Sequence, residues 1–322
     1  MDLRLDNRLT RLLAPDAKDS LQGLADDCQR VQIKSVMTDA EYQRLGRLMA
    51  NRPDVQLWVD SGYPEMFPDL TFLRHFQSLR KLRLTVFELK NWDGLQFLPD
   101  EMEYIDLGWT RTKAHTLEFL SRFQNMRILK VEGHTKGIDA VSSSTKLNDL
   151  VLRSVPLPDL AFLTKLDNLE ILDLKLGGIK DISHLPEIGR IKYLELWMIR
   201  GLTDLAPIGS MSHLEHLHLE SLRQVEALPD MSELMNLHTV LIQNLKGLTD
   251  LSPLADAPAL RTLIIWDGGH LKPENLECLV GHPTLEKVSI GLGSDRKNKV
   301  IDEMLGFASD IPSYRYPREW CV

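Results

Sequence analysis

The chain has 322 residues and a formal net charge of -8 at pH 7, with 26% charged and 43% hydrophobic residues. These proportions are ordinary for a folded globular protein, and the acidic balance argues against a nucleic-acid binder, which normally carries a basic face. No apolar run approaches the roughly 18 residues that a membrane span requires, and the start MDLRLDNRLTRLL lacks the apolar core of a secretory signal. The cysteines Cys28, Cys278 and Cys321 are too few and too scattered for a disulfide framework. We therefore expect a cytoplasmic protein.

Residues 1–53 are expected to form a helical N-terminal cap and a first coil. Leu3 and Leu5 fit a short edge strand, and the segment SLQGLADDC fits a helix with Leu21, Leu24 and Cys28 on one face. A cap of this kind is needed at the end of a repeat array, because the terminal repeat would otherwise expose apolar surface and an unpaired strand edge.

Two strands and a helix are predicted after residue 27. The strands alternate apolar residues at Cys28, Val31 and Ile33, and again at Val55, Leu57 and Val59. Between them, Thr38 and Glu41 form a T-x-x-E capping box, which predicts a helix through roughly Met49.

A six-residue pattern, L-x-x-L-x-L with related apolar residues, recurs through the rest of the chain. Its first apolar position falls at Leu79, Met102, Met126, Leu147, Leu169, Ile191, Leu214, Leu237, Leu260 and Leu285. Successive copies lie 21 to 25 residues apart. A repeat of this length is typical of a solenoid in which each coil contributes one short strand and a return path.

An aspartate precedes a short apolar segment in five of these coils, ten residues before the next strand pattern. These residues are Asp69, Asp159, Asp181, Asp204 and Asp250. We interpret them as helix N-caps rather than catalytic acids, because a carboxylate in this position accepts the free N–H groups of a first helical turn.

These patterns resemble the internalin-like branch of the leucine-rich repeat family, whose unit reads L-x-x-L-x-L-x-x-N-x-I-x-D-I-x-x-L. The resemblance covers roughly residues 70–292 and implies a solenoid that binds ligands with its sheet. The family's Asn is replaced at Gly177, Ile199, Leu222 and Leu245. The turns must therefore satisfy their buried backbone groups in another way. Because we expect neither a signal peptide nor a wall anchor, the family's extracellular role is not implied here.

The array is expected to end after Val288 and Ile290, giving repeats over residues 54–292 and a C-terminal cap over 293–322. Pro273 to Val280 predicts a true helix with proline in its first turn, where the missing N–H costs nothing. The segment KNKVIDEMLGFA predicts a second helix. Its apolar face would consist of Val300, Ile301, Met304 and Leu305.

The residues between the buried apolar positions are expected on the concave, outward face of the sheet, because alternate side chains of a strand point to opposite faces. Aromatic residues mixed with charges are typical of protein-binding surfaces. The predicted partner-binding residues are Asp173, Tyr193, Glu195, Trp197, His216, His218, Glu220 and Trp266, with Trp58, Tyr104 and Trp109 as a second group. Basic residues are more numerous in the early strands and acidic residues in the later ones.

One stretch, HLEHLHLE, could hold a metal. His216 and His218 share a face of one strand, with Glu195 expected opposite His218 on the neighbouring strand. Zinc normally takes three or four protein ligands, so we interpret the histidines as solvated contact residues. We expect no stoichiometric zinc and no other cofactor.

Motifs of enzymes are weak or missing. Gly291 to Gly293 follows a predicted strand and precedes a predicted helix, but Arg296 replaces the third glycine of a dinucleotide-binding turn. No P-loop, G-x-S-x-G or C-x-x-C occurs.

The sequence thus predicts an α/β leucine-rich repeat solenoid, right-handed, with about twelve parallel strands in a single domain over 1–322. Its predicted function is non-enzymatic protein binding on the concave face, as a monomer that binds neither nucleic acid nor membrane. The alternative is a bacterial effector or a toxin-neutralising immunity protein with the same binding surface.

Overall fold

The computed structural model describes residues 28–61 and 69–307, the backbone of Leu9–Leu12, and Leu24, Asp26 and Phe67. The chain groups into two compact units, Met1–Val155 and Pro156–Val322. The predicted edge strand at Leu3 and Leu5, most of the predicted helix before Cys28 and the tail 308–322 lie outside the described residues. The prediction of a single domain over 1–322 stays a prediction.

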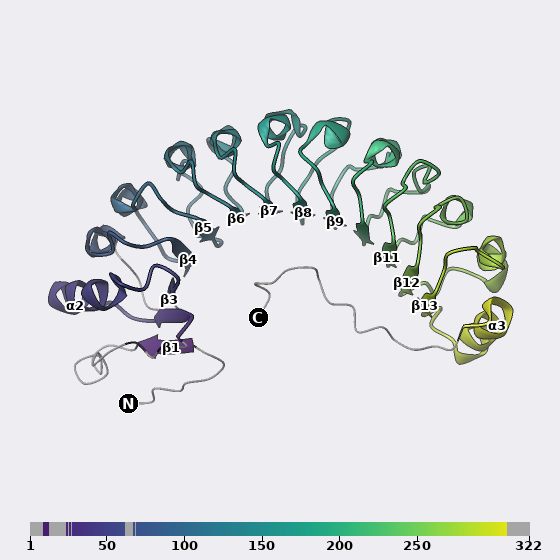
Figure 1. Cartoon of the computed structure of the whole chain (residues 1–322), viewed down its shortest axis with the longest axis horizontal. Coiled ribbons are helices and arrows are strands. Elements are labelled where there is room, and N and C mark those ends of the chain that lie inside the picture. Colours follow the sequence, from purple (N-terminus) through teal and green to yellow (C-terminus); the bar gives the residue numbers. More distant parts are fainter. Residues whose placement is uncertain are drawn as a thin grey trace. The chain divides into compact units, whose positions relative to one another are not determined.

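The first unit contains parallel strands that pair in chain order (Figure 1). They are β1 (Leu9–Leu12), β2 (Arg30–Ile33), β3 (Gln56–Ser61), β4 (Lys81–Val86), β5 (Tyr104–Leu107), β6 (Ile128–Glu132) and β7 (Asp149–Arg153). The return paths carry helix α2 (Asp39–Met49) and the 3-10 turns η1 (Thr71–His75), η2 (Asp93–Phe97), η3 (Glu118–Arg122) and η4 (Ile138–Ser143).

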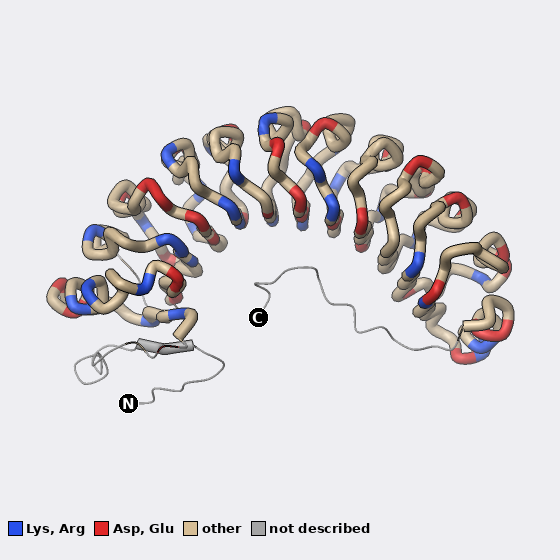
Figure 2. The backbone as a smooth tube through the Cα atoms, in the orientation of Figure 1, with Lys and Arg blue, Asp and Glu red and all other residues tan. Residues whose placement is uncertain are grey.

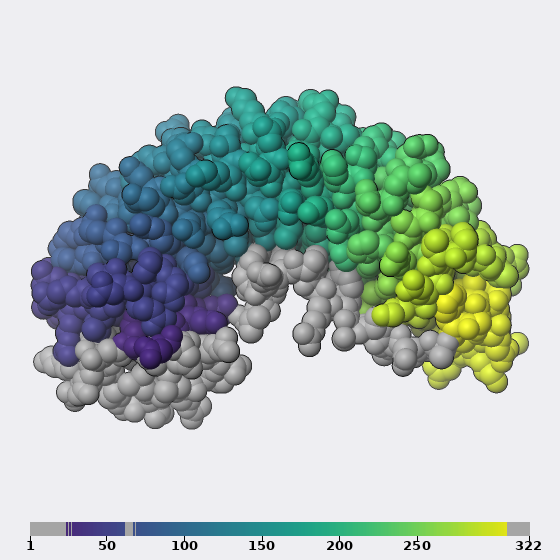
Figure 3. All heavy atoms as spheres, viewed as in Figure 1, coloured from purple at the N-terminus to yellow at the C-terminus, as the bar shows by residue number. Residues whose placement is uncertain are grey.

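The second unit repeats this plan. Its strands are β8 (Ile171–Lys175), β9 (Tyr193–Trp197), β10 (His216–Glu220), β11 (Thr239–Gln243), β12 (Thr262–Trp266) and β13 (Lys287–Ile290), again parallel and in chain order. Its turns are η5 (Ala161–Lys165), η6 (Leu185–Glu187), η7 (Ala206–Ser210), η8 (Ser252–Leu254) and η9 (Pro273–Leu279), followed by helix α3 (Asp295–Leu305). In the space-filling view, the coils of each unit form a continuous stack (Figure 3). No helix among the described residues is both long and apolar enough to cross a bilayer.

The core of each unit lies between the strands and the helical turns, and the predicted repeat register is confirmed. All ten residues that open the L-x-x-L-x-L pattern are buried, from Leu79 to Leu285. Leu174 pairs with Leu196, and Leu196 with Leu219, so equivalent leucines stack from coil to coil. Each coil therefore buries its apolar residues against the same residues of the next coil, which a single coil could not do alone.

The predicted capping devices are present, with one correction. The Thr38 N–H donates to Glu41 Oε2 at 2.7 Å, and Thr38 Oγ1 accepts from the Glu41 N–H at 3.4 Å, which completes the capping box of α2. Each of the five aspartates accepts a hydrogen bond at 2.8–2.9 Å from the backbone N–H two residues later, and Asp230 does the same. Where a 3-10 turn follows directly, its N-cap is the residue after the aspartate, such as Leu160 after Asp159. These aspartates therefore close an Asx turn that leads into the 3-10 turn, because each side chain accepts from the N–H two residues later.

The turns without the family's Asn are bonded by the backbone itself. The residue after each of strands β7 to β12 adopts a left-handed conformation with φ between 51° and 56°, at Ser154, Leu176, Met198, Ser221, Asn244 and Asp267. The N–H of Leu176 donates to the Trp197 carbonyl at 2.8 Å, and that of Met198 donates to the Glu220 carbonyl at 2.9 Å. With the same bond at Ser221 and Asn244, this extends the parallel ladder by one bond beyond strands β8 to β11. Left-handed Leu and Met are unfavourable by roughly 1–2 kcal/mol, so the bond must offset that cost.

The predictions for the C-terminal helices need correction. Residues 273–279 form a 3-10 helix rather than an α-helix, with the Asn275 N–H bonded to the Lys272 carbonyl three residues earlier. In α3, only Ile301 of the predicted apolar face is buried, and Val300 is 44% exposed. Met304 and Leu305 are half-buried. Helix α3 packs along one side against η9, so a narrower apolar stripe suffices to cover the end of the core.

A cluster of aromatic and imidazole rings lies in the first unit, within the return paths. The Trp92 and His115 rings are stacked with centroids 4.6 Å apart, and the His134 ring lies 4.6 Å from Trp92. His134 is 1% exposed, and its Nε2 lies 3.3 Å from the Gly108 carbonyl. Its Nδ1 is buried without a hydrogen bond to any described residue. Burial lowers the pKa of His134 to about 4, because the charged ring would lose its hydration.

We expect Leu174→Asp and Leu217→Asp each to cost several kcal/mol, because both leucines are 1% exposed and an unpaired carboxylate would enter the core. Thermal unfolding followed by circular dichroism measures the loss. Met235→Asp is the control, since Met235 is 65% exposed. Melting of Leu217→Asp within a degree or two of the parent would contradict the register.

We expect acid to destabilise the chain partly through His134. The unfolded chain binds a proton on this ring near pH 6.5 and the folded chain only near pH 4, so this stability is present above pH 6.5 and is lost progressively toward pH 4. Within that window, each unit of decrease in pH lowers the free energy of unfolding by up to about 1.4 kcal/mol through this ring. Denaturant unfolding at several pH values measures the free energy of unfolding. Between pH 6.5 and pH 4 this free energy should fall less steeply in His134→Gln than in the parent. His213→Gln, at an exposed histidine, should keep the parental pH dependence. Equal slopes for parent and His134→Gln would refute the assignment.

Candidate functional site: the outward face of strands β8–β12

The outward side chains of the second unit form three rows that cross the strands, because the parallel pairing is in exact register. The outer rows are Ile171, Tyr193, His216, Thr239 and Thr262 on one side and Lys175, Trp197, Glu220, Gln243 and Trp266 on the other. The central row is Asp173, Glu195, His218, Leu241 and Ile264. We call these three rows the β8–β12 face. The predicted placement of Glu195 opposite His218 is confirmed, and Trp197, Glu220 and Trp266 lie along one edge of the face.

The expected exposure of this face is wrong for half of the predicted residues in the second unit. Asp173, Tyr193, Glu195 and His218 are at most 2% exposed. Trp197, His216, Glu220 and Trp266 are half-buried. Strands lie about 4.8 Å apart, so side chains of this size cover one another. The central row is covered most because it has a row on each side.

The buried residues of the central row are joined by ionic contacts. Lys175 Nζ lies 2.9 Å from Asp173 Oδ2 and 2.8 Å from Glu195 Oε2, and the Tyr193 hydroxyl donates to the same Glu195 oxygen at 3.1 Å. His218 continues the chain of contacts, with Nδ1 3.7 Å from Glu195 Oε1 and Nε2 3.6 Å from Glu220 Oε2. Six side chains from three strands thus form one polar network, here called the Lys175 network.

Carboxylates outnumber cations in the Lys175 network. Burial, followed by the nearby Lys175 ammonium, lowers the pKa of His218 to about 4, so this ring is neutral at neutral pH. Burial, and then the neighbouring Glu195, raises the pKa of Glu220. Two buried carboxyl groups, those of Asp173 and Glu195, therefore share the Lys175 ammonium, and the third, that of Glu220, lies beside the neutral His218 ring. Figure 2 shows acidic and basic residues interspersed along the coils of each unit.

The second predicted group lies in the first unit and is engaged in contacts of its own. Arg83 lies over the Trp58 ring at 4.5 Å and 3.3 Å from Asp106, and the Trp58 Nε1–H donates to Thr85 at 2.6 Å. Tyr104, expected on the surface, is 7% exposed and donates from its hydroxyl to Asp106 at 3.3 Å. Trp109 is 43% exposed, with Lys113 Nζ 3.2 Å from its ring centre.

The two histidines of the HLEHLHLE stretch belong to different clusters. His218 lies with Glu195 and Glu220, whereas His216 lies with Glu215 and His238. The prediction that His216, His218 and Glu195 form one group is therefore wrong for the described residues, because His216 lies in the other cluster. Sequence reasoning missed Glu215 and His238. Their signal was the repeat register, since each immediately precedes the outward residue that opens its strand.

Comparisons with solved structures show the fold of the chain. An internalin from Listeria monocytogenes str. 4b F2365 matches 85% of this chain and 76% of its own at a TM-score of 0.51 and 16% identity. TLR13, solved in complex with ssRNA13, matches 87% of this chain and 46% of its own at a TM-score of 0.56 and 17% identity. A leucine-rich repeat protein of Leptospira interrogans matches 88% of this chain and 91% of its own at a TM-score of 0.47 and 14% identity.

No family model matches the sequence, and no curated protein matches it either. The chain nevertheless has the leucine-rich repeat fold, and the predicted resemblance to internalins is confirmed at the level of that fold.

We expect Lys175→Met to destabilise the chain by roughly 3–5 kcal/mol, because the substitution removes the cation between two buried carboxylates. Lys192→Met is the matched control, since Lys192 pairs with Glu170 where both side chains are about 40% exposed and such pairs contribute about 1 kcal/mol or less. Chemical unfolding of both variants measures the difference. Equal free energies of unfolding for the two variants would show that the Lys175 network does not stabilise the folded chain.

Proposed function

We propose that this leucine-rich repeat solenoid is a non-enzymatic protein-binding scaffold that binds its partner on the β8–β12 face. The observation that carries the proposal is the edge row of Lys175, Trp197, Glu220, Gln243 and Trp266, all half-buried on paired strands. Large aromatic side chains contribute most of the affinity in protein interfaces when rigid neighbours hold them. The repeat's own core does not require tryptophan at either position, because both side chains project away from the buried leucines.

The Lys175 network supports this role by holding the row in place. Lys175 and Glu220 contribute to both the network and the edge row, so their side chains are already ordered before a partner arrives. Pre-ordered side chains lower the entropy lost on binding. The half-buried edge row is then the part of the face that a partner can cover further.

A protein partner fits this face better than nucleic acid does. The matched TLR13 structure contains ssRNA13, but the present chain carries a net charge of -8. The β8–β12 face has one lysine, which is paired with two carboxylates, and a third carboxylate at Glu220. Phosphate backbones are bound by Lys and Arg. The proposal therefore includes no nucleic acid, no membrane and no required oligomer. The free thiol of Cys278, exposed on the surface, supports a reducing compartment such as the cytoplasm.

We expect Trp197→Ala and Trp266→Ala each to lose roughly 2 kcal/mol of partner affinity, about 30-fold in Kd, with little change in thermal midpoint. The partner is first captured from native lysate, treated with nuclease, and then titrated against purified variants. Met235→Ala is the control, because Met235 is the most exposed large apolar residue described and lies in the return path between β10 and β11.

Unchanged affinity in both tryptophan variants would contradict the β8–β12 face as the binding site. The face around Trp58, Tyr104 and Trp109 would then be tested in the same way. Loss of capture after nuclease treatment would contradict a protein partner.

A further inference from the structure

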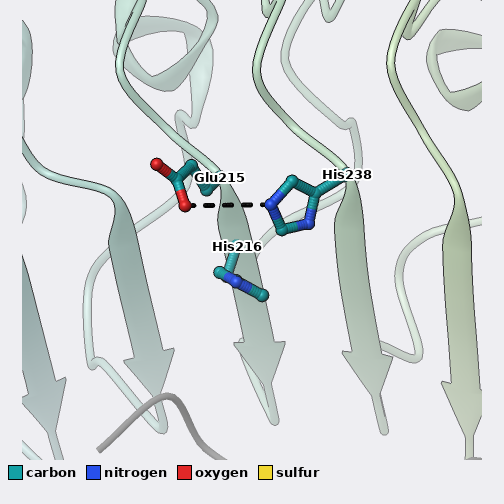
Figure 4. Close-up of side chains that lie close together, drawn as sticks. All are labelled: Glu215, His216 and His238. Atoms are coloured by element: carbon teal, nitrogen blue, oxygen red, sulfur yellow. Dashed lines mark ion pairs between the residues drawn. The ribbon is translucent and has the colours of Figure 1, made fainter.

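Glu215, His216 and His238 converge where strands β10 and β11 begin (Figure 4). One ligand atom from each residue lies within 4.8 Å of the other two. Glu215 Oε2 is 3.8 Å from His238 Nε2, and the His216 and His238 rings meet edge to face with centroids 4.5 Å apart. Three groups that can each bind a metal thus share one small volume at the entry of two paired strands.

The backbone fixes the positions from which these side chains project. The N–H groups of His238 and Thr239 both donate to the Glu215 carbonyl, at 3.0 and 3.2 Å, and the N–H groups of Glu215 and His216 both donate to the Lys192 carbonyl at 2.8 Å. The three residues therefore belong to the strand ladder rather than to a loose loop. A metal site on such elements keeps its geometry better than one on a loop.

The two rings differ in the surroundings of their second nitrogen. His238 Nδ1 lies 3.3 Å from Thr239 Oγ1, a contact that leaves Nε2 turned toward Glu215. Metal-binding histidines are commonly oriented by such a bond from their second nitrogen. His216 Nδ1 is buried and makes no hydrogen bond to a described residue.

We propose that Glu215, His216 and His238 bind one divalent transition-metal ion, and that zinc is the ion they fit best. This proposal replaces the sequence-based expectation of no stoichiometric zinc, which considered His216 with His218 and Glu195 rather than with Glu215 and His238. Two imidazoles and one carboxylate are an ordinary zinc ligand set with bonds of about 2.0–2.2 Å, and three protein ligands leave a fourth position for water or for a group of a partner. Tetrahedral ligands at that bond length lie about 3.3 Å apart. Glu215 and His238, each 38% exposed along the side chain, can close the present 3.8 Å by small rotations.

The neighbouring trio of Glu195, His218 and Glu220 is a poorer metal site although its ligand atoms are equally close. Lys175 Nζ already lies 2.8 Å from Glu195, so an ammonium occupies the place that a metal cation would need. The two nitrogens of His218 also face different carboxylates. The proposed site does not depend on the proposed binding function, since it is tested on the chain alone.

The test uses the full chain without a purification tag, stripped with chelator and then dialysed. Isothermal titration with zinc chloride is expected to give one equivalent, and titration with cobalt(II) chloride to give the visible absorption bands of a four-coordinate ion. His216→Ala, His238→Ala and Glu215→Gln are each expected to weaken zinc binding at least tenfold. Far-UV circular dichroism and thermal midpoints of the metal-free variants show that the loss is not a loss of folding.

Two control variants make the result decisive. His213→Ala removes an exposed histidine of the same coil and is expected to keep the parental zinc affinity. His218→Asn removes the histidine of the competing cluster and should also keep it. The proposal is overturned if stripped protein binds no zinc below millimolar concentration, if the three ligand variants bind as the parent does, or if only His218→Asn loses binding.

Discussion

The constraint on which the whole structure depends is that every coil returns to the same register. Apolar residues are buried only if each strand pairs with the next at equivalent positions, as Leu174 does with Leu196 and Leu196 with Leu219. A shift of one residue would turn the whole set of leucines outward. The coil length of 21–25 residues can vary, but the variation must be absorbed in the return paths. Those paths use short 3-10 turns and Asx turns, which allow a residue to be added or removed without disturbing the strands.

The same register decides the chemistry of the outward face. Residues 22 or 23 positions apart become neighbours, so carboxylates that are distant in the chain are brought within reach of one lysine. Such proximity costs desolvation free energy unless the charges are paired. Lys175 supplies this pairing for Asp173 and Glu195, and the neutral ring of His218 separates Glu195 from Glu220. The face is therefore built from an ordered, partly charged interior with a row of larger side chains along its edge.

Two residues on one strand can have different roles because neighbouring strands differ. His216 and His218 project from the same side of β10, yet Tyr193 and His238 flank the first, and Glu195 and Glu220 face the second. His216 has a nitrogen without a hydrogen bond to a described residue and lies beside the His238 ring. His218 instead lies beside Glu195, which is paired with Lys175. A binding scaffold with a zinc ion at one end of its face and a fixed ionic network beside it would have two means of partner selection on adjacent strands.

The sequence by itself determined the features that depend on local pattern and period. The spacing of Leu169, Leu172 and Leu174, repeated coil after coil, predicted strands and burial because side chains alternate along a strand whatever surrounds it. Thr38 with Glu41 predicted a helix start for the same reason, since the bonded groups are three residues apart. Tertiary structure alone decided that Glu195 and His218 are buried and that His238 meets Glu215, because these contacts join strands about 22 residues apart in the chain. Exposure and ion pairing depend on the size and charge of those distant neighbours, which no local pattern contains.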